Sequence, residues 1–150
     1  MLNARKIDSR GFGKECCFEV SVAGTVVGIV NDTKLTFEVD NRSFSIASSK
    51  VVGRQYELKA GDTVVASAKQ KPLFNYYNVD FAGKQWTFKA TNLLATEFGF
   101  FENETQTGTL SAGSFFNRLK DIKADLPDHV PREIQMFLLC LFISKLTEPS

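Results

Sequence analysis

The stretch VPREIQMFLLCLFISKL, Val130 to Leu146, decides the fold of this chain. Its central run, Met136 to Ile143, is apolar at every position, so apolar side chains point in all directions around a helix. Pro131 stands where the first turn of a helix tolerates proline. A helix that is apolar all round must be buried on every side, and burying this run contributes about 10–20 kcal/mol as an upper bound. The pattern predicts a buried core helix over 130–146.

Insertion into a membrane is the alternative for this run. A spanning helix needs roughly 20 apolar residues, and the run is much shorter. Gln135, Ser144 and Lys145 also stand close to its two ends. In a chain of 150 residues, a closed sheet is the structure that can surround such a helix. We therefore expect a β-barrel around it.

From Glu15 to about Lys123, apolar and polar residues alternate with period two, as in half-buried strands. The first examples are Phe18, Val20 and Val22, which alternate with Glu19 and Ser21. Turn-forming pairs separate the strands: Ala23-Gly24, Asn31-Asp32, Asn41-Arg42, Gly61-Asp62, Ala82-Gly83 and Asn103-Glu104. This spacing predicts antiparallel strands joined by short turns.

An internal repeat sharpens this prediction. FEVSVAGTVVG (Phe18 to Gly28) resembles YELKAGDTVVA (Tyr56 to Ala66), and FGFFENETQTG (Phe98 to Gly108) is a fainter third copy. A four-stranded unit of about 40 residues used three times gives about twelve strands. Three such units are fewer than the number of blades that closes a propeller. We expect one domain over 1–150, a mainly β, closed antiparallel barrel. Gly28, Ala66 and Gly108 occupy matching positions and would let the strands approach the helix.

This layout resembles the tubby-like superfamily, and within it the LURP-one-related and phospholipid-scramblase-like branch. The segments that carry the resemblance are YELKAGDTVVASAKQ, FNYYNVDFAGKQWTFKATN, FGFFENETQTGTLSAG and DLPDHVPREIQMFLLCLFISKL, which together cover roughly Tyr56 to Leu146. The resemblance implies a barrel plugged by its C-terminal helix and no enzymatic role.

The resemblance also implies function. Some relatives bind phosphoinositide head groups and others are linked to lipid scrambling, so we expect a non-enzymatic interaction or membrane-peripheral module. Its partner would be an anionic phospholipid surface or a protein, and a lipid-scramblase-like role is one alternative. Cys16 and Cys17 are a faint echo of the acylated cysteine cluster of some relatives. As neighbours on a strand they face opposite sides, so we favour structural roles over modification.

Composition argues against nucleic-acid-binding, disulfide-bonded and secreted proteins. The net charge is +1 with interspersed charges, which argues against a nucleic-acid partner. The three cysteines, Cys16, Cys17 and Cys140, form no disulfide or metal-binding pattern, and the first residues form no signal peptide. Both observations favour a cytoplasmic protein.

Catalytic chemistry has little support in the sequence. The single histidine, His129, has only Asp128 beside it, and sequence neighbours rarely face each other. No metal-ligand set or cofactor motif is present, so we expect neither metal nor cofactor. An enzyme using carboxylates such as Glu97, Glu102 or Glu104 is the less favoured alternative.

The candidate binding site consists of three lysines. Lys69 and Lys71 flank a turn, and Lys84 lies on the next hairpin. If they converge, they can hold an anionic head group, although solvated strand ends are the commoner outcome. A small-ligand carrier barrel is the other alternative, and it requires an empty lumen.

Overall fold

The computed structural model describes residues 1–7, 17–49, 54–71, 74–113 and 121–147. The elements are β1 Leu2–Ile7, β2 Cys17–Val22, β3 Thr25–Asn31, β4 Thr36–Val39, β5 Arg42–Ser49, β6 Arg54–Ala60, β7 Thr63–Gln70, β8 Tyr76–Phe81, β9 Lys84–Ala90, β10 Glu97–Glu102, β11 Thr105–Ala112, β12 Ile122–Asp125 and α1 Arg132–Thr147. The strands form a closed barrel in the order β1-β12-β11-β10-β9-β8-β7-β6-β5-β4-β3-β2, and every pairing is antiparallel. This confirms the predicted architecture of twelve strands and one C-terminal helix.

The start of the sheet differs from the prediction. The first strand is β1, which lies ahead of the predicted limit at Glu15 and closes the barrel by pairing with both β2 and β12. Leu2 and Ala4 point inward and are buried, whereas Arg5 on the outer face binds Glu19 of β2 at 3.3 Å. The alternation is short in this segment because the charged Lys6, opposite Phe18, takes the next inward position and is exposed.

The internal repeat is a structural repeat. Each predicted copy is a hairpin with one register shift at the same place, between Val20 and Ser21, Leu58 and Lys59, and Phe100 and Phe101. Units one and two are β2–β5 and β6–β9. Unit three is β10–β12, and its fourth place is taken by β1, because β1 pairs with β12 and β2 as β5 pairs with β4 and β6.

The two ends of the barrel are built differently. One end, called the turn end, carries five two-residue turns: Ala23-Gly24, Asp40-Asn41, Gly61-Asp62, Ala82-Gly83 and Asn103-Glu104. The second of these corrects the predicted Asn41-Arg42, because Val39 pairs with Arg42 and the positive φ angles are those of Asp40 and Asn41. The opposite end, called the loop end, holds the connections 32–35 and 91–96 and residues Lys71, Phe74 and Asn75.

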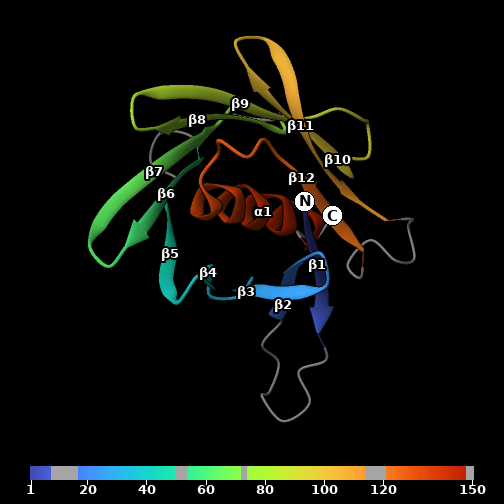
Figure 1. Ribbon diagram of the computed structural model, residues 1–150. Helices are drawn as coiled ribbons and strands as arrows, with labels where there is room; N and C mark the ends of the chain where they lie inside the picture. The colour runs from blue at the N-terminus through green and yellow to red at the C-terminus, as the bar shows by residue number, and fades with distance from the viewer. Residues whose placement is uncertain (8–16, 50–53, 72–73, 114–120, 148–150) are drawn as a thin grey trace.

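The helix α1 fills the barrel and runs from the turn end towards the loop end, enclosed by the strands (Figure 1). Every side chain from Met136 to Ile143 is at most 2% exposed, as the sequence predicts. Near the middle of the barrel Met136 faces Gly28, and closer to the loop end the ring of Phe142 lies 5.4 Å from that of Phe98. In the part of the chain that is described, no helix is long and apolar enough to cross a membrane.

Two of the three small residues of the repeat, Gly28 and Gly108, have different neighbours. A Cβ on Gly28 would lie 2.5 Å from the Glu38 carbonyl oxygen and 3.1 Å from Met136, so the absent side chain allows a close approach to the helix, as predicted. A Cβ on Gly108 would instead meet Asp125 and Leu126, both at 2.9 Å. In the third copy the small residue therefore makes room for the segment that leads to α1.

Candidate functional site

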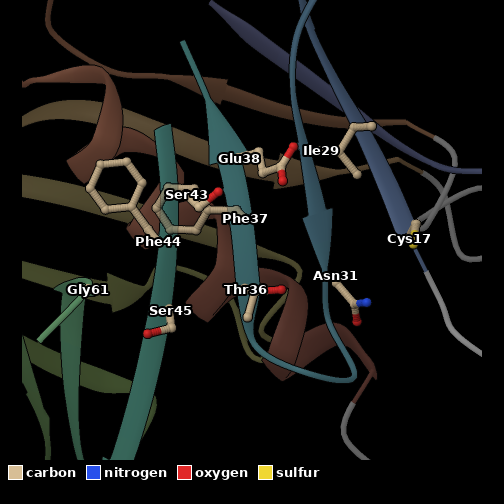
Figure 2. A pocket seen from close by; sticks show the side chains of 10 residues that line it. All are labelled: Cys17, Ile29, Asn31, Thr36, Phe37, Glu38, Ser43, Phe44, Ser45 and Gly61. Carbon is tan, nitrogen blue, oxygen red and sulfur yellow. The ribbon is translucent and has the colours of Figure 1, made fainter. Parts of the chain in front are cut away.

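Two hollows in the described surface border residues that the sequence analysis singles out. The larger, of about 510 Å³, lies on the outside of the barrel over β3, β4 and β5. Figure 2 shows its lining, with Thr36 and Glu38 of β4 between Ile29 of β3 and Ser43 of β5. The hollow is broad and open because β4 and β5 carry small polar side chains there, and its lining has no paired acid and base. It offers a surface and no evident chemistry.

Cys17 lies at one edge of this hollow, where it is half-buried and free. It belongs to the outer face, because its neighbour Phe18 points into the core and is fully buried. Cys140 is enclosed in the barrel, and burial raises the pKa of its thiol far above the ordinary value. Cys16 lies outside the described residues, so the predicted division of the cysteine pair is seen only for Cys17.

The second hollow, of about 490 Å³, lies at the turn end beside His129. His129 Nε2 lies 2.5 Å from Glu102 Oε1, and Thr107 Oγ1 donates to Glu102 Oε2 at 2.7 Å. Burial acts to raise the pKa of Glu102, but the hydrogen bonds from His129 and Thr107, with the nearby charges of His129 and Lys84, outweigh it and lower the pKa. His129 therefore has a carboxylate partner distant in sequence, which is not the neighbouring Asp128.

The first two units of the repeat show which residues occupy the positions of this cluster elsewhere in the barrel. The positions of Glu102 and Thr107 correspond to Val22 and Val27 in the first unit and to Ala60 and Val65 in the second, and these pairs pack against the core. The third unit has polar side chains at these positions because the chain crosses this corner to reach α1, and His129 lies in that crossing. Among the described residues, the hydroxyl bonded in this cluster is that of Thr107, and it donates to the Glu102 carboxylate and not to the imidazole, as an activated nucleophile would. We interpret the cluster of Glu102, Thr107 and His129 as a structural contact that holds the segment before α1 against the hairpin β10–β11.

The loop end carries the most unusual surface. Leu93 and Leu94 in the connection 91–96 are fully or largely exposed, at 103% and 82%, and Phe74 is 66% exposed. Phe74 and Asn75, which precede β8, lie beside the start of the connection 91–96, since the Ala90 N–H donates to the Asn75 carbonyl at 2.9 Å. Single exposed leucines are ordinary, but a pair at a loop tip with an exposed phenylalanine on the adjoining connection forms an apolar projection.

The leucine tip is held by its own hydrogen bonds. Asn92 Oδ1 accepts from the N–H groups of Thr96 (3.0 Å) and Glu97 (3.3 Å), and Asn92 Nδ2 donates to Thr96 Oγ1 at 2.8 Å. Thr91 Oγ1 donates to Glu97 Oε1 at 2.8 Å. A side chain that satisfies backbone groups in this way fixes a tight loop. The loop therefore presents Leu93 and Leu94 to solvent in an ordered conformation.

The predicted lysine site is only partly assembled. Lys71 lies at the loop end, where its N–H donates to the Tyr76 carbonyl at 2.9 Å, and Lys69 is two strand positions further inside. Lys84 pairs with Phe81 at the turn end, so five strand positions separate it from the level of Tyr76, or about 16 Å. The predicted convergence with Lys84 is wrong. Lys89 takes its place, because it lies directly opposite Tyr76.

Lys71 and Lys89 gather around one aromatic ring. Lys71 Nζ is 4.2 Å and Lys89 Nζ 5.7 Å from the centre of the Tyr76 ring, and Lys89 Nζ is also 4.6 Å from the Phe101 ring centre. Cation–π contacts of this kind favour ammonium groups near ring faces. Sequence reasoning missed Tyr76 and Lys89, although counting back from the Ala82-Gly83 turn pairs them.

Formal charge differs between the two ends. Each end is defined here as its described connections, the two residues of every strand that lie nearest to them, and the adjoining end of α1. The loop end has the basic residues Lys6, Lys34, Arg54, Lys69, Lys71, Lys89, Lys123 and Lys145 and the acidic residues Asp32, Glu97 and Asp121. The turn end has the acidic residues Glu38, Asp40, Asp62, Asp80, Glu102, Glu104, Asp125, Asp128 and Glu133 and the basic residues Arg42, Lys59, Lys84 and Arg132. The barrel is therefore polarised along its length, although the whole chain is nearly neutral.

The described residues contain no group of three or more His, Cys, Asp or Glu side chains that could hold a metal ion. No protein-family model, no curated protein and no solved structure matches this chain.

Proposed function

We propose that this protein is a non-enzymatic, membrane-peripheral module that docks its loop end on an anionic phospholipid surface. The observation that carries the proposal is the ordered projection of Leu93 and Leu94 from a basic end of the barrel. Apolar side chains that enter the interface and cations that face head groups are the two components of reversible membrane binding.

The magnitudes are sufficient for reversible binding. Burying a leucine or phenylalanine side chain contributes about 1.5–3 kcal/mol, and each lysine near an anionic surface contributes about 1 kcal/mol. Leu93, Leu94, Lys71 and Lys89 together can offset the loss of freedom on docking, and the affinity should fall as salt screens the lysines. A projection fixed by Asn92 reduces the entropy lost on binding.

The polarity of the barrel selects one orientation. The basic loop end is attracted to an anionic surface, whereas the acidic turn end is repelled by it. The exposed apolar residues Val26 and Val64 lie near the turn end, so exposure alone does not distinguish the two ends. Of the two ends, only the loop end combines exposed apolar residues with an excess of basic over acidic side chains in the described structure.

A small-ligand carrier is less well supported, because α1 fills the lumen with buried side chains. The resemblance to the tubby-like superfamily, with its LURP-one-related and scramblase-like branch, stays a proposal. A twelve-stranded barrel around a C-terminal helix is the architecture that the resemblance implies, and it supports the membrane proposal by analogy. A scramblase-like activity has no observation of its own in the described residues.

Co-sedimentation with vesicles tests the proposal. The wild-type protein should partition onto phosphatidylcholine vesicles that contain phosphatidylserine, and the variant Leu93→Ser/Leu94→Ser should bind at least about tenfold more weakly, a loss of ~1.4 kcal/mol. The matched control, Val26→Ser/Val64→Ser, removes exposed apolar side chains at the turn end and should bind like the wild type. Absence of wild-type binding at low salt, or equal binding of the leucine variant, would refute the proposal. Loss of binding in both variants would also refute the assigned orientation.

A further inference from the structure

The hollow over β3, β4 and β5 lacks the groups for a reaction, but it contains a charge that the chain leaves unbalanced. Glu38 is the one charged residue among the described residues that line this hollow of about 510 Å³. Its side chain is exposed and, in the described structure, has neither a hydrogen bond nor an ion pair. Figure 2 shows its carboxylate turned towards Ile29, its partner across the β3–β4 pair.

Three basic residues on the strands around the hollow are placed away from this carboxylate. Arg5 binds Glu19 at 3.3 Å. The guanidinium of Arg42 lies 4.8 Å from the centre of the Phe44 ring, to which it makes a cation–π contact. Lys59 lies on β6, which β5 separates from β4. None of these three cations pairs with the carboxylate in the hollow.

The repeat shows that the missing cation is particular to the first unit. An acidic residue stands at the same place on the outer face of all three units, Glu38, Asp80 and Asp125. In unit two Lys69 lies diagonally across from this acid, and in unit three Lys123 lies two residues before it on the same face. Unit one has uncharged side chains at both corresponding positions, Asn31 and Thr36.

The hollow itself results from short side chains. Ser43 stands opposite Glu38, whereas the longer Gln85 stands opposite Asp80 in unit two. The short hydroxyl side chain leaves the space beside the carboxylate open. Ile29, which is 45% exposed, borders this space from β3. Unit one therefore combines an unpaired carboxylate, an apolar neighbour and room for a third group.

We propose that this hollow binds an arginine side chain of a polypeptide partner, with the guanidinium on Glu38 and the aliphatic stem on Ile29. A guanidinium donates two parallel hydrogen bonds to a carboxylate and is less strongly hydrated than an ammonium group. Its stem packs on apolar surface while the charged head stays partly in water. The site thus offers one contact for each part of the side chain.

The shape of the hollow favours a polypeptide over a small molecule. Small-molecule sites enclose most of their ligand, whereas this hollow is broad and open. Its strands are paired on both sides in the closed barrel, so the partner binds through side chains and not as an added strand. The hollow lies on the wall between the two ends of the barrel, and the inference is therefore independent of membrane docking at the loop end.

The test uses the blocked peptide acetyl-Leu-Arg-Leu-amide and a matched peptide with citrulline, which has nearly the shape of arginine without its charge. Binding is followed by the backbone amide resonances of Ile29, Glu38 and Ser43. The arginine peptide should give saturable shifts, and the citrulline peptide should bind about three- to fivefold more weakly. Shifts that do not saturate up to about 10 mM peptide, or equal affinity for the two peptides, would overturn the proposal.

Three variants locate the site. Glu38→Gln should abolish the preference for arginine, and Asp80→Asn, which removes the corresponding acid of unit two, should retain it. Ser43→Gln places the longer side chain of unit two in the hollow and should weaken both peptides about fivefold or more. A preference that survives Glu38→Gln, or that Asp80→Asn removes equally, would overturn the site. Glu38→Gln should bind anionic vesicles like the wild type, so the peptide site and the membrane function can fail separately.

Discussion

The turn end and the loop end share every strand of the barrel, yet they differ in almost every surface property. At the turn end, two-residue turns close the hairpins, acidic side chains predominate, and His129 and Glu102 fasten the segment that leads into α1. At the loop end, a longer connection exposes Leu93 and Leu94 and lysines gather at Tyr76. The strands fix the positions of both ends, and the connections determine what each end can contact.

This difference shows where binding can be placed without a cost to the core. The buried side chains of the barrel and of α1 are common to both ends, so they give no direction to the molecule. Connections can vary while the rigid strands hold them in place, as is usual for binding sites on β-scaffolds. The asymmetry of the connections is therefore the best guide to the contact surface.

The largest expected effect on stability comes from a substitution in the core that the two ends share, because its loss unfolds both. Leu139→Asp places an unpaired charge in the middle of α1, where Leu139 is 1% exposed. This costs about 3–5 kcal/mol or more, a large part of the stability of an ordinary domain. We expect loss of the cooperative thermal transition and of the near-ultraviolet dichroism of Trp86. Leu93→Asp, on the exposed loop, should melt like the wild type; a folded Leu139→Asp protein would contradict the buried helix.

A smaller effect should be confined to the loop end. Asn92→Ala removes the side chain that bonds Thr96 and Glu97, which should cost about 1 kcal/mol and speed hydrogen exchange at both amides. Binding to anionic vesicles should weaken about three- to fivefold, because the leucine tip is no longer preordered.

The control for this change is Asn31→Ala. Asn31 Oδ1 accepts from the N–H groups of Thr33 and Lys34 in another loop-end connection. Its loss should speed exchange there and leave vesicle binding unchanged. If both variants weakened binding equally, general loosening of the loop end would be the cause.

The smallest effect belongs to the turn end and depends on pH. The pKa of Glu102 is lowered below its ordinary value of 4.5, so the carboxylate stabilises the fold above that pH, and this contribution is lost as pH falls through the lowered value. Glu102→Gln should therefore unfold more easily at neutral pH by less than about 1 kcal/mol, since His129 is half exposed. The difference from wild type should vanish in acid, in urea titrations at several pH values. Glu104→Gln serves as control, and a difference that grows in acid would contradict the assignment.

Much of the fold was predictable from the sequence, because repetition supports each strand assignment by its counterparts. The hairpins that begin at Phe18, Tyr56 and Phe98 have their register shift at matching positions. The strand β1 belongs to none of these hairpins, and Lys6 at an inward position interrupts its alternation. Its role follows only from closure, since a cyclic arrangement of three units lacks one strand without it.

The candidate site was less predictable, and register explains why. Lys84 is close to Lys71 in hairpin order, but the tight turn at Ala82-Gly83 places it at the opposite end. The same turn, counted residue by residue, pairs Tyr76 with Lys89. The contact between His129 and Glu102 depends on the path of the chain across the turn end, which no local pattern encodes. Leu93 and Leu94 were visible in the sequence as an apolar pair inside an otherwise polar connection, and this pair could have been predicted to be exposed.

Completion of the third unit by β1 has a consequence for biosynthesis. Residue 2 pairs with residue 124, and α1 follows all twelve strands in the chain. A ribosome therefore releases the whole wall of the barrel before the side chains that fill it, and the wall cannot close around a core that is not yet made. We expect the emerging strands to depend on protection from aggregation until the last apolar segment arrives, because contacts of such high sequence separation form late.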